Sequence, residues 1–206
     1  MNEKFEHFLS GRGIHLSAAQ KELLERYKSI FLDVSTRINL ISDSDRVRLE
    51  EKHFTDSLAP LELIPHGVKI ADWGSGGGLP GIPLAIARPD LKVTVVESRL
   101  KKASFLLRVK RELELANVSV FAQRGEELNE SFDLITIRAV GKLREVLPRV
   151  ATHITEKGKL LFYKGPGLDS ELRDAGKVIS RFGFKLKIEE ARLPLEEDRR
   201  YLLLTR

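Results

Sequence analysis

Residues 71–81, with the sequence ADWGSGGGLPG, decide the fold of this chain. They follow a short apolar run at residues 68–71, which predicts a buried strand, and they precede residues 82–87, which predict a helix. A strand, a glycine-rich turn and a helix form the unit with which a doubly wound sheet holds a nucleotide-like cofactor against backbone N–H groups. Glycine suits such a turn because it allows sharp bends and a close approach of the backbone to a ligand.

Two details beside the glycines favour S-adenosylmethionine over a dinucleotide. The glycines also satisfy the dinucleotide pattern G-x-G-x-x-G, so by themselves they do not identify the ligand. Asp72, two residues before Gly74, is a carboxylate that would repel a pyrophosphate. It can orient the loop or accept a hydrogen bond from the ammonium group of S-adenosylmethionine. Pro80 and Pro83 lack N–H donors that a pyrophosphate would use at the start of the helix.

The second predicted strand, residues 92–97, ends in the acid Glu97. A carboxylate about 20 residues after the glycine loop is placed to bind both ribose hydroxyls of a nucleoside. NAD would use the same contact, so Glu97 supports a nucleoside without choosing between the two cofactors. The alternative for the whole stretch is an ordinary tight turn beside a strand-end acid.

Five motifs, in order along the chain, resemble the bacterial 16S ribosomal RNA N7-guanosine methyltransferase family, first called glucose-inhibited division protein B. The motifs are INLI at 38–41, KHFTDSL at 52–58, DWGSGGGLPGIP at 72–83, ESRLKK at 97–102 and IRAV at 137–140. The resemblance runs from about Asn39 to Arg138 and continues weakly to the end. The chain has Val34 and Ser35 where that family commonly has an aromatic residue, and Leu79 where Phe is frequent.

The resemblance implies S-adenosylmethionine as cofactor and a set of residues that bind it. These are Asp72, Gly74, Gly76, Leu79, Glu97, Gly125, Glu126 and Arg138. Gly125 and Glu126 follow the third predicted strand and would contact the adenine; their alternative is a surface turn. Arg138 closes the fourth strand and would open onto the cofactor cleft; its alternative is a salt-bridged strand end.

The alternation of strands and helices along the rest of the chain predicts an α/β fold with a mostly parallel sheet. Strands are predicted near residues 68–73, 92–97, 117–123, 132–138, 158–163, 184–190 and 199–205, and helices near 81–88, 99–115, 142–153 and 168–182. Only about six residues separate the last two strands, so they must form a hairpin. By resemblance, a seven-stranded Rossmann-like sheet with a terminal antiparallel hairpin is the class I S-adenosylmethionine-dependent methyltransferase fold.

Residues 1–65 predict an N-terminal helical extension, and residues 66–206 the methyltransferase domain. Within the extension, Ser17 and Gln20 have the spacing of a capping box at the start of a long helix. A further amphipathic segment is predicted through residues 47–63.

Composition restricts the function further. The chain has 206 residues, no cysteine and a net charge of +5. A disulfide, a cysteine nucleophile and a cysteine-ligated zinc are therefore excluded, and we expect no metal. The positive charge suits a polyanion, and by resemblance the partner is 16S ribosomal RNA or the small ribosomal subunit. No apolar run approaches the length of a membrane span, so we expect no membrane partner. Because the chain has no cysteine, the reducing cytoplasm is its expected location, and we expect a monomer.

Basic residues provide candidates for RNA binding. Lys101 and Arg108 fall on one face of the predicted helix 99–115, Lys164 follows the fifth strand, and Arg199 opens the last strand. The alternative is a solvated basic surface.

The expected reaction is a direct in-line displacement of the cofactor's methyl group by guanine N7. N7 carries a free lone pair and no proton, so no general base is needed and we assign no catalytic residue. The chain lacks the Asn/Asp-Pro-Pro-aromatic run of amino-group methyltransferases after strand four, and lacks the cysteine of carbon-5 pyrimidine enzymes. His53 and Asp56, one helical turn apart, are interpreted as structural, and by resemblance their segment covers the cofactor pocket.

Three alternatives remain open. The first is an RNA methyltransferase with a different acceptor atom, the second a small-molecule methyltransferase, and the third a non-catalytic ribosomal RNA-binding assembly factor on the same fold. A dehydrogenase is disfavoured because too few residues remain for a second catalytic domain.

Overall fold

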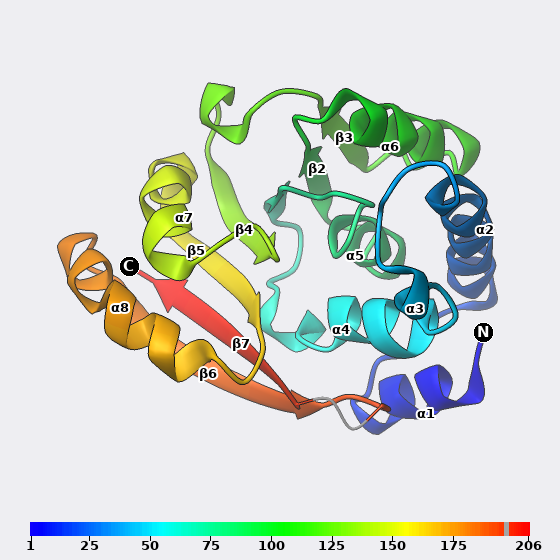
Figure 1. Ribbon diagram of the computed structural model, residues 1–206, viewed down its shortest axis with the longest axis horizontal. Helices are drawn as coiled ribbons and strands as arrows, with labels where there is room; N and C mark the ends of the chain where they lie inside the picture. The colour runs from blue at the N-terminus through cyan, green and yellow to red at the C-terminus, as the bar shows by residue number, and fades with distance from the viewer. Residues whose placement is uncertain (196–197) are drawn as a thin grey trace.

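A seven-stranded sheet runs through the middle of the protein (Figure 1), here a computed structural model that describes residues 1–195 and 198–206. The strands are β1 (Lys69–Trp73), β2 (Lys92–Val96), β3 (Val118–Phe121), β4 (Phe132–Arg138), β5 (Ile154–Lys164), β6 (Lys185–Arg192) and β7 (Asp198–Thr205). Their order is β3-β2-β1-β4-β5-β7-β6. The first five strands pair in parallel, and β7 lies antiparallel between β5 and β6. The predicted fold with its terminal hairpin is confirmed.

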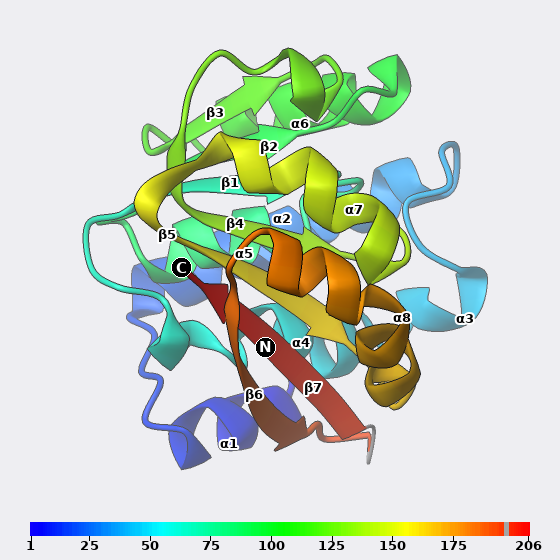
Figure 2. The same ribbon diagram turned by 90° about the vertical axis from the view of Figure 1, so that its left-hand side faces the viewer.

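Helices cover both faces of the sheet (Figures 1 and 2). The helices α2 (Ala18–Ser35), α5 (Gly81–Ala87) and α6 (Leu100–Glu112) lie on one face, and α7 (Leu143–Val150) and α8 (Leu168–Arg181) lie on the other. Each face has its own buried cluster, and neighbouring residues of one strand belong to opposite clusters: Ile70 to the first and Ala71 to the second. This alternation follows from the two-residue period of a strand and makes the central strands apolar throughout.

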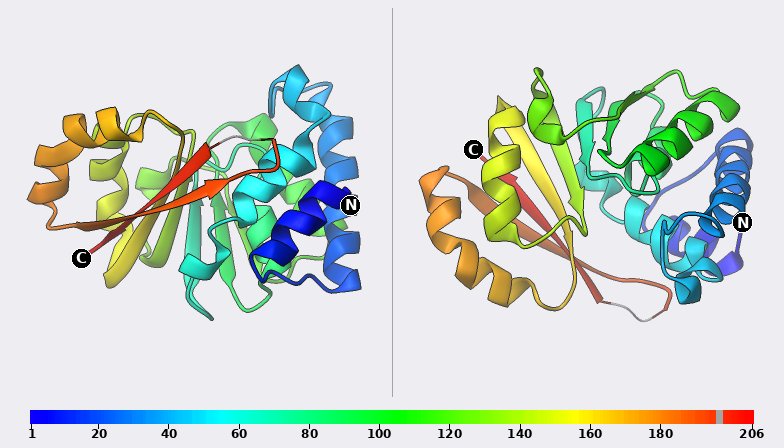
Figure 3. Two further views of the ribbon diagram at one scale, coloured as in Figure 1. Left: turned by 90° about the horizontal axis from the view of Figure 1, so that it is seen from below. Right: turned by 45° about the horizontal axis from the view of Figure 1, so that its top comes forward.

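The N-terminal helices share the first of these cores. Helix α1 (Glu3–Gly11) and helix α2 lie on the opposite side of the molecule from α8 (Figure 3). Ser17 accepts a hydrogen bond from Gln20 N, and the Gln20 side chain accepts one from Ser17 N, so the capping box is confirmed. Tyr27 and Phe31 of α2 are fully buried in the cluster that contains α5 and α6. The division between residues 65 and 66 stays a prediction about folding units.

The segment predicted as one amphipathic stretch over residues 47–63 is broken into short helices. The pieces around it are α3 (Asp43–Arg46), the π-helix η1 (Leu49–Phe54), α4 (Thr55–Leu58) and the 3-10 helix η2 (Leu61–Leu63). The Thr55 hydroxyl donates to the carbonyl of Glu50, and the Ser57 hydroxyl to the carbonyl of His53. Such side-chain bonds compete with the regular helical pattern, and they accompany the widened turn of η1.

Three smaller elements complete the chain. The 3-10 helix η3 (Gly125–Glu127) follows β3, and η4 (Ala151–His153) ends the region predicted as one helix over residues 142–153. Strand β5 begins at Ile154, earlier than predicted. Across residues 1–195 and 198–206, none of the helices combines the length and the apolar character needed to span a bilayer.

Candidate functional site

The glycine loop after β1 needs glycine for its backbone shape. Gly74, Gly76 and Gly78 have φ values of +74°, +58° and +88°, in the left-handed region that side chains disfavour. A Cβ atom on Gly74 would lie 2.8 Å from Val140 Cγ2. The amides of Gly74 and Ser75 both donate to the carbonyl of Val96, at 2.9 and 3.0 Å. The loop is therefore held tightly against the end of β2, at the carboxyl edge of the parallel strands where ligands bind in such sheets.

Asp72 lies beneath this loop and holds it in place. Its side chain is 1% exposed. One carboxylate oxygen accepts hydrogen bonds from the Ser75 hydroxyl and from the amide of Gly81, and the other accepts one from the Thr136 hydroxyl on β4. Burial raises the pKa of Asp72, against the lowering effect of these bonds. Of the two roles predicted for this carboxylate, these contacts favour orientation of the loop; direct contact with a cofactor stays a prediction.

Glu97 closes the other side of the loop. Its Oε2 accepts a hydrogen bond from Gly76 N at 3.0 Å, and its Oε1 accepts one from Arg99 N at 2.8 Å. The carboxylate is buried and lies directly after β2, next to the glycines. This is the geometry that binds a ribose at a strand end in doubly wound sheets.

A cavity of about 280 Å³ opens above the loop. It is lined by Leu40, Ile41, Asp45, His53, Gly74, Ser75, Gly76, Gly77, Leu79, Lys102, Arg138 and Ala139. The structure thus brings together four of the predicted cofactor residues: Gly74, Gly76, Leu79 and Arg138. The sequence alone did not single out Asp45 and Lys102 as cavity residues. For Lys102 a signal existed, because it belongs to the ESRLKK motif, but nothing in that motif distinguishes it from Lys101.

Arg138 both lines the cavity and takes part in ion pairs. Its guanidinium donates to the Ser57 hydroxyl and to the carbonyl of His53, contacts His53 Nδ1, and lies 3.4 Å from a carboxylate oxygen of Asp56. The two alternatives predicted for Arg138, a cleft residue and a salt-bridged strand end, therefore describe one arrangement. Asp56 also accepts a hydrogen bond from the Tyr201 hydroxyl on β7, at 3.0 Å.

His53 is held neutral by its surroundings. The side chain is buried, and burial together with the adjacent Arg138 guanidinium lowers its pKa to about 3. Because Arg138 donates toward Nδ1, the ring proton belongs on Nε2, which faces Asp45 Oδ2 at 3.5 Å. His53 and Asp56 each contact Arg138, and the structure assigns no hydrogen bond between them. Their interpretation as structural residues stays a prediction.

Gly125 and Glu126 begin the 3-10 helix η3, which follows β3, and they are not among the residues that line the cavity. A Cβ on Gly125 would lie 2.3 Å from the indole ring of Trp73, so only glycine fits there. Glu126 is exposed and forms an ion pair with Arg149, which lowers its pKa. Their contact with an adenine stays a prediction.

Three of the four predicted RNA-binding residues are already in ion pairs. Arg108 donates to Glu112 and to Asp33, at 2.8 and 3.2 Å. Lys164 Nζ lies 2.7 Å from a carboxylate oxygen of Glu171. Arg199 Nε lies 3.6 Å from Asp56 Oδ1, and Lys101 is exposed. An RNA phosphate at the first three positions would have to compete with a carboxylate.

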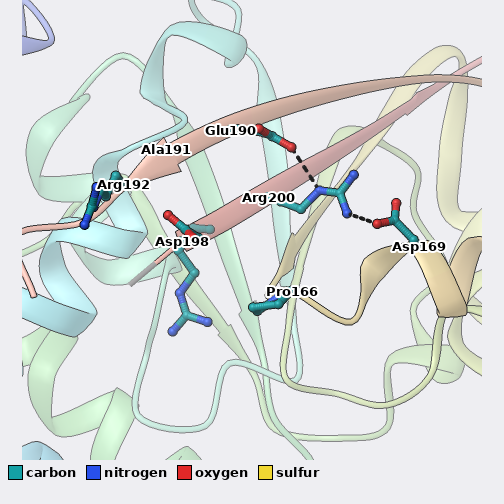
Figure 4. A pocket seen from close by; sticks show the side chains of 8 residues that line it. Pro166, Asp169, Glu190, Ala191, Arg192, Asp198 and Arg200 are labelled. Atoms are coloured by element: carbon teal, nitrogen blue, oxygen red, sulfur yellow. Dashed lines mark ion pairs between the residues drawn. The ribbon is translucent and has the colours of Figure 1, made fainter. Parts of the chain in front are cut away.

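A hollow of about 490 Å³ lies beside the terminal hairpin (Figure 4). Arg199 is also among the residues that line it. The charged residues around it are Arg192, Arg199, Arg200, Asp169, Glu190 and Asp198. Arg200 is paired with Asp169 at 2.8 Å and with Glu190 at 3.2 Å. Three cations thus face three anions, so the hollow as a whole does not favour a phosphate.

Comparison with known proteins identifies the family to which the chain is similar. A family model described as rRNA small subunit methyltransferase G matches residues 20–194. The chain is similar to the ribosomal RNA small subunit methyltransferase G of Sorangium cellulosum, with 44% identity over 87% of this chain and 78% of that protein. It is also similar to the one of Lactobacillus acidophilus, with 34% identity over 99% of this chain and 90% of that protein.

Among solved structures, the fold is shared with a SAM dependent methyltransferase from Aquifex aeolicus. The TM-score is 0.58 at 16% identity, and the match covers 78% of this chain and 94% of that one. This likeness supports the fold, and the family model and the two relatives cover most of the sequence. The chain therefore belongs to the GidB family of rRNA small subunit methyltransferases G.

Proposed function

We propose that this protein transfers the methyl group of S-adenosylmethionine to N7 of a guanine in 16S ribosomal RNA. Membership of the family and the methyltransferase fold make S-adenosylmethionine the methyl donor. The observation that carries the proposal is the cavity at the carboxyl edge of the sheet, whose floor is the glycine loop and whose neighbour is Glu97. When bound, the cofactor supplies a methyl group on a positively charged sulfur.

The residues around the loop fit that cofactor. Left-handed glycines at Gly74 and Gly76 let a ligand approach the backbone where a Cβ would intrude. Glu97 would accept hydrogen bonds from the ribose hydroxyls, and Leu79 would contact the cofactor from the cavity wall. We further propose that Gly125 and Glu126 contact the adenine and that Arg138 forms the side of the cavity next to the reacting groups. Asp72 would then act through the loop, because its oxygens are occupied by the loop's own donors.

The titratable side chains of the cavity suit a methyl acceptor atom that carries no proton and so needs no base to remove one. His53 is neutral and engaged by Arg138, and Asp45 is paired with Lys52 at 3.0 Å. Arg138 itself is paired with Asp56. None of these groups is poised to remove a proton, and guanine N7 does not require one. Catalysis would rest on alignment of the methyl group with the N7 lone pair, so we expect no rate dependence on an essential general base.

The substrate and setting follow from the same proposal. The net charge of +5 favours a polyanion, and Lys101, Arg108, Lys164 and Arg199 are the proposed RNA contacts. We propose that the protein acts as a monomer in the cytoplasm on the small ribosomal subunit or its RNA, without a metal.

Chemical cleavage of the product tests the acceptor atom. N7 methylation leaves a fixed positive charge on the imidazole ring of guanine, so borohydride followed by aniline cleaves the RNA chain at that base. The enzyme is incubated with S-adenosylmethionine and small subunits from a strain that lacks the modification, with a Gly74→Val variant as the control that should not bind the cofactor.

Each outcome distinguishes the alternatives. A new cleavage site that depends on enzyme and cofactor supports the proposal. Methyl incorporation without cleavage points to a different acceptor atom. No incorporation on subunits or naked RNA, with cofactor binding intact, points to a non-catalytic assembly factor.

A further inference from the structure

We propose that Lys102 binds the carboxylate of the amino-acid group of S-adenosylmethionine, and that this single cation selects for cofactors that carry this group. The inference rests on the proposed function, in that it takes the cavity above the glycine loop as the cofactor site. It adds a residue and a part of the ligand that the glycine loop and Glu97 do not account for.

Lys102 has the right position. It lies in the first turn of α6, directly after the segment that carries Glu97, and it lines the cavity together with Gly74 and Gly76. A Cβ built on Gly76 would lie 3.9 Å from Lys102 Nζ. The ammonium group therefore lies within reach of any ligand that rests on the loop, and it reaches the loop from the side of β2.

Lys102 also has an uncompensated charge, unlike the other ionisable groups that line the cavity. Arg138 is paired with Asp56, Asp45 is paired with Lys52, and His53 is neutral. Over residues 1–195 and 198–206, the Lys102 ammonium has neither an ion pair nor a hydrogen bond. A half-buried cation without a partner at the edge of a ligand cavity is stabilised by an anionic ligand.

The anion that fits this position is the carboxylate of the cofactor. S-adenosylmethionine carries one carboxylate, and the glycine loop together with Glu97 provides for the nucleoside part. An RNA phosphate is the other anion available to this protein, but it would approach the exposed side of α6, where Lys101 projects. Lys102 is only partly exposed and is directed at the loop.

Two ligands that differ only in the amino-acid group test the assignment. S-adenosylhomocysteine has the carboxylate, and 5′-methylthioadenosine keeps the adenosine and the sulfur but lacks it. Calorimetric titration of each ligand is made into wild-type protein, Lys102→Met and Lys102→Arg. The matched control is Lys101→Met, which removes the same charge from the neighbouring, exposed position.

We expect Lys102→Met to bind S-adenosylhomocysteine about tenfold more weakly, the size of one charge-assisted hydrogen bond. Its affinity for 5′-methylthioadenosine should stay within about twofold of wild type. Lys102→Arg should recover most of the lost affinity, and Lys101→Met should leave both affinities unchanged. Thermal unfolding should be alike for all variants, since the Lys102 ammonium makes no bond within the described protein.

Other outcomes overturn the inference in distinguishable ways. Equal weakening of both ligands by Lys102→Met would mean that the lysine only shapes the pocket. Unchanged binding of both ligands would place the carboxylate elsewhere, and if RNA binding then weakened, Lys102 would serve the phosphate. A wild-type protein that binds neither ligand would overturn the proposed function and this inference with it.

Discussion

Replacement of His53 by a side chain that does not titrate should make the protein less sensitive to acid. His53 is 7% exposed, and its pKa in the folded protein is lowered to about 3 by burial and by the Arg138 guanidinium. In the unfolded chain the pKa returns to about 6.5. Below pH 6.5 the unfolded chain therefore takes up a proton that the folded protein refuses. The stabilisation is complete above pH 6.5 and is lost as the pH falls toward 3.

The size of the effect follows from these two pKa values. From pH 7.5 to about 6.5 the free energy of unfolding changes little on account of His53, because the residue is mostly neutral in both states. From about pH 6.5 to pH 5 the free energy of unfolding falls by about 1.4 kcal/mol per pH unit, which amounts to about 2 kcal/mol. The variant His53→Gln lacks this proton but retains a polar side chain of similar length. At pH 7.5 we expect it to be less stable than wild type, because contacts with Arg138 and Asp45 are weakened.

Urea unfolding of both proteins at pH 7.5, 6.5, 5.5 and 5.0 measures the effect. The difference in free energy of unfolding between wild type and His53→Gln should shrink by about 2 kcal/mol from pH 7.5 to pH 5. Parallel stability curves for wild type and His53→Gln would refute the reasoning, since they would mean that His53 takes up its proton equally in both states.

Three further predictions concern the loop and the RNA surface. In calorimetry, wild-type protein should bind S-adenosylhomocysteine and should not bind NAD. The variant Gly74→Val should lose the binding of S-adenosylhomocysteine, because the φ of +74° at position 74 disfavours a branched side chain. Normal affinity of the variant for S-adenosylhomocysteine would contradict this prediction. Asp72→Ala should lower the free energy of unfolding by about 1–3 kcal/mol in urea, because it leaves buried donors without an acceptor, and an unchanged midpoint would argue against the loop-holding role. Combining Lys101→Glu with Arg108→Gln and Lys164→Gln should weaken ribosomal RNA binding and flatten its salt dependence while cofactor affinity stays unchanged; RNA affinity that survives would make this a merely solvated surface.

Local pattern was enough to predict the sheet, because strands buried on both faces are recognisable as short apolar runs between turns. It also predicted the capping box at Ser17, since both partners lie within four residues. It did not predict the breaks within residues 47–63, a segment that is held by residues far away in the sequence: Arg138 donates to the carbonyl of His53, and the Tyr201 hydroxyl donates to Asp56. The choice between the two roles of Asp72 likewise depended on Thr136, which is 64 residues away in sequence.

The four predicted RNA contacts differ in how much a bound phosphate would gain at each cation, because some of these cations already have a carboxylate partner. Lys101 is exposed, so a phosphate there gains the full attraction of a surface cation. Arg108 and Lys164 would exchange a carboxylate partner for a phosphate, and the net gain at each is therefore smaller.

Arg199 is a special case, because its partner Asp56 also holds Arg138 beside the cavity above the glycine loop and accepts a hydrogen bond from Tyr201. A phosphate that drew Arg199 away would leave the whole Asp56 carboxylate to Arg138 and Tyr201. Contacts at the hairpin and contacts at the cavity thus share one buried carboxylate. For this reason we expect substitution of Arg199 alone to change the affinity for the cofactor as well as the affinity for RNA. Substitution of Lys101 should change the affinity for RNA only.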